Sequence, residues 1–168
     1  MQTIFQDVEV SAKMLSQLQW VMSPETPQEN DSSAERWVLM HSIWKLFEKM
    51  TPTQSFQVGK LFAQSLYFPA RIQNFDAAVT HLHLHFRKMH RNRYAGYFQI
   101  HYIDIQKREI KIECCTPYPS YFNRGMLTAL FKKYKQGNIE FFEVMPDPNH
   151  RPNQSNITQP DVYLIMWG

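Results

Sequence analysis

The stretch YFQIHYIDIQKREIKIECCTPYPSYFNRGML, from Tyr97 to Leu127, decides the fold of this 168-residue chain. Apolar and polar residues alternate through its first part, on both sides of a polar turn around Lys107. Two neighbouring runs with this period of two predict a β-hairpin that buries one of its faces. The residues expected on the buried face are Phe98, Ile100, Tyr102, Ile110, Ile112 and Cys114.

The second part of the stretch predicts a turn that leads into a helix. Two prolines interrupt the strand pattern, and Asn123 has the side chain of a good N-cap residue. Apolar residues then recur at helical spacing until Gly137, which fits a helix stop. Residues 139–144 and 162–167 have the pattern of two more strands. The chain from about residue 94 onward is therefore predicted to be ββαββ.

Four helices are predicted ahead of the hairpin, separated by breaks that contain proline. Apolar spacing indicates a first helix over about residues 5–19 and a fourth from Phe75 to Met89. A Ser-x-x-Glu capping box at residues 32–35 predicts the start of the second helix. The apolar face expected for the second helix is Trp37, Met40, His41, Trp44, Phe47 and Met50. The third helix is expected to bury Phe56, Gly59, Phe62, Ala63 and Leu66.

Helices followed by ββαββ predict an α+β fold, in which the N-terminal helices pack on an antiparallel four-stranded sheet. The expected order is α-α-α-α-β-β-α-β-β. We expect one domain over residues 1–168, with a helical part over about 1–93 and a ββαββ part over about 94–168. A cavity between the two layers is a natural place for a ligand. The loop from Met145 to Pro160 is long enough for a flap or a partner-binding surface.

Composition limits the partners and the location. The formal net charge is +3, which is too small to indicate a nucleic-acid partner. The first residues lack the basic start and apolar run of a signal peptide, and no stretch is long enough to span a bilayer. We therefore expect a cytoplasmic protein. Cys114 and Cys115 are adjacent, and Cα atoms about 3.8 Å apart are too close for a disulfide, so we expect two free thiols.

Residues 112–127, IECCTPYPSYFNRGML, resemble the strand, T-x-P-Y-P-like turn and Arg-Gly helix start of bacterial 4-vinyl-reductase-type small-ligand-binding domains. Residues 85–97 resemble the passage of that family from a helix into the first strand, and residues 163–167 resemble its last strand. The resemblance implies a wider superfamily, which includes the haem-based nitric-oxide-binding (H-NOX) domains and the small subunits of vesicle-tethering complexes. These relatives differ in role, so the resemblance implies a fold and leaves the function open.

The resemblance and the residues together favour a non-catalytic sensor or carrier domain that holds an apolar small molecule between its helices and its sheet. We expect the ligand to be lined by Phe62, Phe86, Phe98, Ile100, Ile112, Cys114 and Leu127, with Tyr118 and Arg124 at its polar end. The start of the helix near Phe122 favours an anion at that end. The sequence shows no nucleophile–base pair, paired carboxylates, phosphate-binding glycine loop or complete set of metal ligands, so we do not expect an enzyme.

A haem-based gas sensor is the alternative that the H-NOX resemblance implies. The spacing of Phe75, His83 and Phe98 is similar to that of the helix phenylalanine, proximal histidine and strand phenylalanine of that family, so His83 is the haem ligand if this alternative holds. The Y-x-S-x-R motif that holds the haem propionates in that family is absent, since residues 113–117 read ECCTP. Haem is therefore possible but disfavoured, and we expect no other cofactor.

A third alternative is an assembly subunit with a filled core, as the vesicle-tethering relatives imply. In this superfamily the N-terminal helices often pair two subunits, so we expect a homodimer with Trp37 or Trp44 as an anchor. The sequence carries no fused output domain, so a sensor of this kind would need a separate downstream signalling protein.

Overall fold

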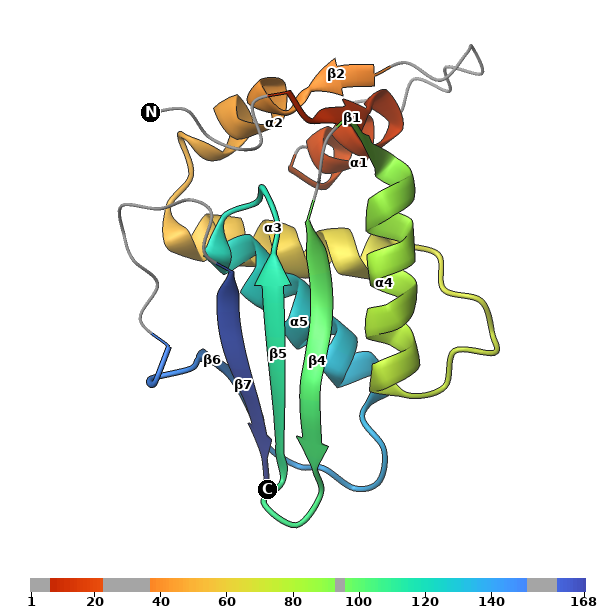
Figure 1. Cartoon of the computed structure of the whole chain (residues 1–168), viewed down its shortest axis with the longest axis vertical. Coiled ribbons are helices and arrows are strands. Elements are labelled where there is room, and N and C mark those ends of the chain that lie inside the picture. Colours follow the sequence, from red (N-terminus) through yellow and green to blue (C-terminus); the bar gives the residue numbers. More distant parts are fainter. Residues whose placement is uncertain (1–6, 23–36, 93–95, 151–159) are drawn as a thin grey trace.

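The computed structural model describes residues 7–22, 37–92, 96–150 and 160–168 (Figure 1). The elements in chain order are β1 (Glu9–Ser11), α1 (Ala12–Met22), β2 (Trp37–Leu39), α2 (Met40–Phe47), α3 (Pro52–Ser65), α4 (Phe75–Met89), β3 (His90–Arg91), β4 (Tyr97–Asp104), β5 (Glu109–Cys115), α5 (Ser120–Tyr134), β6 (Phe142–Pro146) and β7 (Asp161–Trp167). Helices α3 and α5 cover one face of a four-stranded sheet, and α4 runs beside β4. The predicted α+β fold is confirmed.

The main sheet is antiparallel throughout, with the strand order β4-β5-β7-β6. Ile112 of β5 lies between Ile100 of β4 and Tyr163 of β7, and its side chain is fully buried under the helices. A register shift in β4 between Ile100 and Tyr102 ends the simple alternation of inward-facing and outward-facing side chains. Tyr102 is consequently 41% exposed, so the expectation that it faces inward is wrong.

Helices α3 and α5 cross at unusually short range because each contributes a glycine. A Cβ atom on Gly59 would lie 2.1 Å from the carbonyl oxygen of Phe122, and one on Gly125 would lie 2.1 Å from the carbonyl oxygen of Phe56. The two backbones therefore touch where other helices would interpose side chains. This contact joins α3 to α5, which packs against the sheet (Figure 1).

Helix α4 has the bounds that its periodicity predicts. The Asn74 side chain accepts a hydrogen bond from the N–H of Ala77 at 2.8 Å and so caps its first turn. The side chains buried along this helix are Phe75, Ala78, Val79, Leu82 and Phe86. A capping box formed by Thr51 and Gln54 starts α3 in the same way.

The N-terminal part contains a second, small sheet that the sequence did not indicate. Its strand order is β2-β1-β3, and Ser11 pairs with Trp37 while Val10 pairs with both Val38 and His90. The second helix therefore begins at Met40, and the prediction that Trp37 lies on it is wrong. Pairing with β1 favours the extended form of the apolar run at residues 37–39. The capping box predicted at residues 32–35 lies outside the described residues.

Two boundaries in the C-terminal part also differ from the predicted ones. Helix α5 begins at Ser120 with Pro119 as its N-cap, so Asn123 is not the cap but a fully buried residue within the first turns. The strand predicted at residues 139–144 is β6, which starts at Phe142 and extends to Pro146. The predicted loop therefore begins at Asp147, and its residues 151–159 lie outside the described part of the chain.

Replacing Gly125 with alanine should destabilise the protein by about 3 kcal/mol, because the new methyl group meets a backbone carbonyl that cannot rotate away. Alanine normally stabilises a helix relative to glycine, so a loss identifies the crossing as the cause. Denaturant unfolding of Gly125→Ala gives the value. The control is Gln57→Ala at an exposed position of α3, which should change stability by less than about 0.5 kcal/mol. Equal stabilities for the two variants would contradict the close crossing.

Candidate functional site

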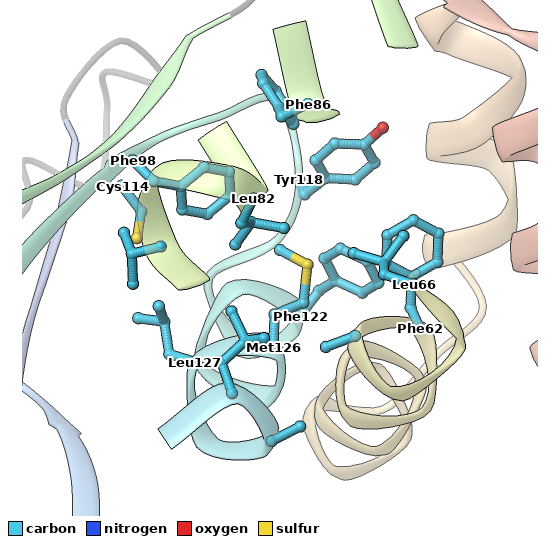
Figure 2. Packing of buried hydrophobic residues seen from close by; sticks show 14 of the residues in the cluster. Phe62, Leu66, Leu82, Phe86, Phe98, Cys114, Tyr118, Phe122, Met126 and Leu127 are labelled. Carbon is cyan, nitrogen blue, oxygen red and sulfur yellow. The ribbon is translucent and has the colours of Figure 1, made fainter. Parts of the chain in front are cut away.

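The helices meet the sheet along a row of aromatic side chains that we call the aromatic seam: Phe62, Phe86, Phe98, Tyr118 and Phe122 (Figure 2). The ring centroid of Phe86 lies 5.5 Å from that of Phe98 and 6.0 Å from that of Tyr118. Phe122 continues the row, at 5.1 Å from Tyr118 and 5.6 Å from Phe62. These are ordinary distances for tilted and edge-to-face ring pairs. The seam thus links α4, β4, α5 and α3 by direct ring contacts.

The predicted lining residues mostly gather in this seam or beside it. Those that are 5% exposed or less are Phe62, Phe86, Phe98, Ile112, Cys114, Tyr118 and Leu127. Ile100 is partly buried and packs against the same core cluster. Arg124 lies elsewhere: its Nε donates to the carbonyl oxygen of Val144 at 2.5 Å, and its guanidinium covers the ring of Phe56. The structure therefore gives Tyr118 and Arg124 different partners, and contact of the lining residues with a ligand stays a prediction.

A buried hydrogen-bonded pair, His90 and Tyr118, lies at one end of the seam. The His90 ring stacks on Phe86, with centroids 4.0 Å apart. Its Nδ1 lies 2.6 Å from the carbonyl oxygen of Phe86, and its Nε2 lies 2.8 Å from the hydroxyl of Tyr118. A carbonyl oxygen can only accept, so Nδ1 carries the proton and Nε2 accepts from the Tyr118 hydroxyl. That hydroxyl also lies 3.2 Å from the sulfur of Met14 on α1.

Both members of the pair are neutral at neutral pH. Burial lowers the pKa of His90 to about 4, although its bond to the Phe86 carbonyl acts in the opposite direction. Burial also raises the pKa of the Tyr118 hydroxyl well above its usual range. Sequence reasoning missed His90 as a core residue because it follows the basic residues at the end of α4. The available signal was its position four residues after Phe86, on the same helical face.

The start of α5 is occupied by a carboxylate of the chain itself. Asp161, the first residue of β7, accepts from the Ser120 hydroxyl at 2.7 Å and from the amide of Asn123 at 3.4 Å. The Tyr163 hydroxyl donates to the carbonyl oxygen of Ser120 at 2.7 Å, and its oxygen lies 3.2 Å from the same carboxylate. An anion at this helix start is what the dipole favours, and Asp161 supplies it. An external anion at this position would meet that carboxylate.

A hollow of about 530 Å³ lies between α4 and the edge of the main sheet. We call it the α4–β4 hollow. It is lined by His83, Arg87, Gly96, Tyr97, Phe98 and Gln99. The Nδ1 atom of His83 accepts the backbone N–H of Phe98 at 3.4 Å. Phe98 thus lines the hollow and also belongs to the aromatic seam. A second hollow of about 400 Å³ lies at the tip of the hairpin, over residues 102–107.

The two thiols are free and buried. Burial raises the pKa of the Cys114 thiol well above its usual range, and the carboxylates of Asp161 and Glu113 act in the same direction. The same causes raise the pKa of Cys115. Neither thiol is activated as a nucleophile by this environment, since a reactive cysteine needs a nearby cation.

The residues do not fit the haem site that the H-NOX resemblance implies. The expected ligand His83 lies at the margin of the sheet beside Arg87, and its Nδ1 is engaged by Phe98. The candidate propionate donors are taken by the chain: Tyr118 donates to His90, Ser120 to Asp161 and Arg124 to Val144. Within the described residues, no group of three or more His, Cys, Asp or Glu side chains could hold a metal ion.

The two tryptophans expected as dimer anchors have partners within the chain. Trp44 donates from its indole N–H to the carbonyl oxygen of Pro117 at 2.7 Å. The guanidinium of Arg91 lies 4.3 Å from the centre of the Trp37 ring and pairs with Glu9 at 2.6 Å. A homodimer stays a prediction. Over the ranges that the structure describes, no helix is both long and apolar enough to cross a bilayer.

Comparison with known proteins shows similarity at the level of the fold. No protein-family model matches the chain, and no curated protein matches it. A Cs H-NOX mutant with the unnatural amino acid 4-cyano-L-phenylalanine at site 5 aligns with a TM-score of 0.58 and 11% identity, over 93% of this chain and 95% of that chain. A protein from work on modulating haem redox potential through protein-induced porphyrin distortion aligns with a TM-score of 0.51 and 14% identity, over 94% of this chain and 84% of that chain. The chain therefore has an H-NOX-like fold, whereas the other parts of the resemblance stay predictions.

The buried, neutral His90 should make stability depend on pH. In the unfolded chain this residue takes up a proton near pH 6.5, whereas in the folded protein it does so near pH 4. The unfolded state therefore binds more protons between these values, and the stabilisation present above pH 6.5 is lost as the pH falls towards 4. Lowering the pH from 7.5 to 4.5 should remove about 2.5 kcal/mol that is specific to His90.

The measurement is denaturant unfolding of the wild type and of His90→Phe at both pH values. Phenylalanine keeps the ring that stacks on Phe86 but cannot be protonated. His83 and His85, whose pKa values are also lowered by burial, are present in both proteins and cancel in the comparison. A parallel pH dependence of the two proteins would show that His90 is not buried in its neutral form.

Proposed function

We propose that this chain is a non-catalytic small-molecule-binding domain, a sensor or a carrier, whose ligand enters at the α4–β4 hollow and contacts the aromatic seam. One observation carries the proposal: Phe98 lines the hollow and packs against Phe86 in the seam. A molecule in the hollow would therefore lie beside Phe98, the residue at which the seam ends and which is 5% exposed. Pockets of this kind combine apolar walls with a few polar groups that set orientation.

The fold supports a binding role of this class. One similar structure is an H-NOX mutant, and the other comes from work on haem redox potential, and these two likenesses support a ligand-binding role. Because the haem-site residues of this chain are engaged elsewhere, the proposal excludes haem and takes an organic ligand instead. The apolar body of that ligand would contact Phe98 first and reach Phe86 or Ile100 by displacing seam side chains.

The surroundings of the seam offer a route by which binding could be sensed. Phe86 stacks on His90, and His90 is joined through Tyr118 to Met14 on α1. A ligand that shifts Phe98 and Phe86 would therefore disturb the hydrogen bond between His90 and Tyr118, and with it the contact of the Tyr118 hydroxyl with the Met14 sulfur on the N-terminal helix. A downstream signalling protein, or a second copy of the chain, would read that change at the surface of α1 or α2.

Binding can be tested with native mass spectrometry of the freshly purified protein and with the neutral fluorescent probe N-phenyl-1-naphthylamine. We expect either an excess native mass that corresponds to a small organic molecule or saturable probe binding with one site per chain. Gln99→Trp places an indole in the α4–β4 hollow and should weaken probe binding about tenfold, because it fills the space that the probe needs.

The matched control is Gln106→Trp, which makes the same exchange in the hollow at the hairpin tip and should leave probe binding unchanged. Absence of both a bound molecule and saturable probe binding would refute the binding function. A bare dimer mass together with that absence would favour the assembly-subunit alternative.

A further inference from the structure

The side of the α4–β4 hollow that α4 forms carries two residues that can donate hydrogen bonds, His83 and Arg87. His83 and Arg87 are one turn apart on α4, so their side chains lie on the same face of the helix. Arg87 is exposed, and among the described residues no acceptor competes for its five donors, whereas the neighbouring Arg91 is held by Glu9. The guanidinium is close enough to His83 to contribute to the lowering of the pKa of that imidazole.

The hydrogen bond between His83 and the sheet fixes which imidazole nitrogen is a donor. Its Nδ1 accepts the backbone N–H of Phe98, so in the neutral ring the proton is on Nε2. The imidazole is therefore held as a donor through Nε2, next to the guanidinium. Two donors with one positive charge form a site that suits an oxyanion.

The charges around the hollow favour an anion as well. The C-terminal end of α4 carries about half a negative charge from the helix dipole, but Arg87 and Lys88 contribute two positive charges in its last turn. The nearest acidic residue of the sheet, Glu113, accepts from the Tyr97 hydroxyl and pairs with His101 at 3.0 Å. Glu113 therefore adjoins the hollow through Tyr97, and both of its oxygens are already engaged by Tyr97 and His101.

The other positions where an anion was expected are closed by the chain itself. Asp161 occupies the start of α5, and Arg124 is bound to Val144 beside Phe56. By contrast, His83 and Arg87 line the α4–β4 hollow, beside the region where the ligand is predicted to bind.

We infer that the ligand is a small organic anion, whose carboxylate or comparable oxyanion is bound by Arg87 and the Nε2–H of His83 while its apolar body lies along Tyr97 and Phe98. This inference rests on the proposed binding function and specifies its ligand class. It assigns to α4 the polar end of the site, which the sequence had placed at Tyr118 and Arg124.

Two probes with the same skeleton test the inference. 1-Anilinonaphthalene-8-sulfonate is N-phenyl-1-naphthylamine with an added sulfonate, so the pair differs by one anionic group. We expect the wild type to bind the sulfonate more tightly than the neutral probe, and Arg87→Gln to weaken the sulfonate about fivefold while changing the neutral probe less than twofold. His83→Leu should act in the same direction, and added NaCl should weaken the sulfonate alone.

Lys88→Gln is the matched control, because it removes one positive charge from the same exposed turn without lining the hollow. It should leave the affinity for the sulfonate within twofold of the wild type. Circular dichroism and the unfolding midpoint show that each variant is folded, so that probe binding to loosened protein is recognised.

The outcomes separate this inference from the proposed function. One outcome would keep the binding function and overturn the anion site. In that outcome the neutral probe binds at one site per chain, and Arg87→Gln and Lys88→Gln change the affinity for the sulfonate equally. Binding of neither probe by wild-type protein that also carries no copurified molecule would remove the proposed function itself. A loss of sulfonate affinity confined to Arg87→Gln and His83→Leu supports the inference.

Discussion

The contact between the backbones of α3 and α5 determines how closely these helices approach and which aromatic rings can meet. At Gly59 and Gly125 no side chain separates the two helices, so each glycine lies against a carbonyl of the opposite helix. Phe62 and Phe122 flank this crossing and can then reach each other across it. The aromatic seam begins at this pair, continues through Tyr118 to Phe86 and ends against the sheet at Phe98 (Figure 2). A wider crossing would separate the first two rings and break the row.

Polar groups inside this frame are satisfied by one another. His90 lies between the Phe86 carbonyl and the Tyr118 hydroxyl, and Asn123 lies between Thr116 and Asp161. Because an unmade hydrogen bond is costly in a buried place, these pairings favour one arrangement of the seam over its alternatives. At the margin the situation is different, because Arg87 and His83 line a hollow. The interior polar groups thus stabilise the fold, while those beside β4 are the ones that we assign to a ligand.

Helices and strands whose own residues favour that structure are predicted correctly from the sequence. Elements whose structure depends on contacts with a distant segment are not. The 3.6-residue period and the Asn74 cap are local, so α4 has its predicted bounds. Residues 37–39 form a strand because Ser11 and Val10 lie opposite them, and no feature of the run itself shows that partner. Asn123 has the side chain of a good cap, yet Pro119 is the N-cap and the Asn123 amide donates to Asp161, 38 residues away. Phe62, Phe86 and Phe98 were predicted from their apolar period, whereas Phe122 was not among the predicted lining residues. His90 was missed because its burial depends on Tyr118, from a loop beyond the hairpin.

The position of β7 has a consequence for the order in which the chain can assemble. This strand comprises residues 161–167, yet it lies between β5 and β6 in the middle of the sheet and carries the Asp161 carboxylate that completes the start of α5. During synthesis, the apolar faces of β5 and α5 are made before the strand that covers and caps them. The main sheet therefore cannot be completed until β7 has been made, and in that interval β5 presents an unpaired edge to other chains.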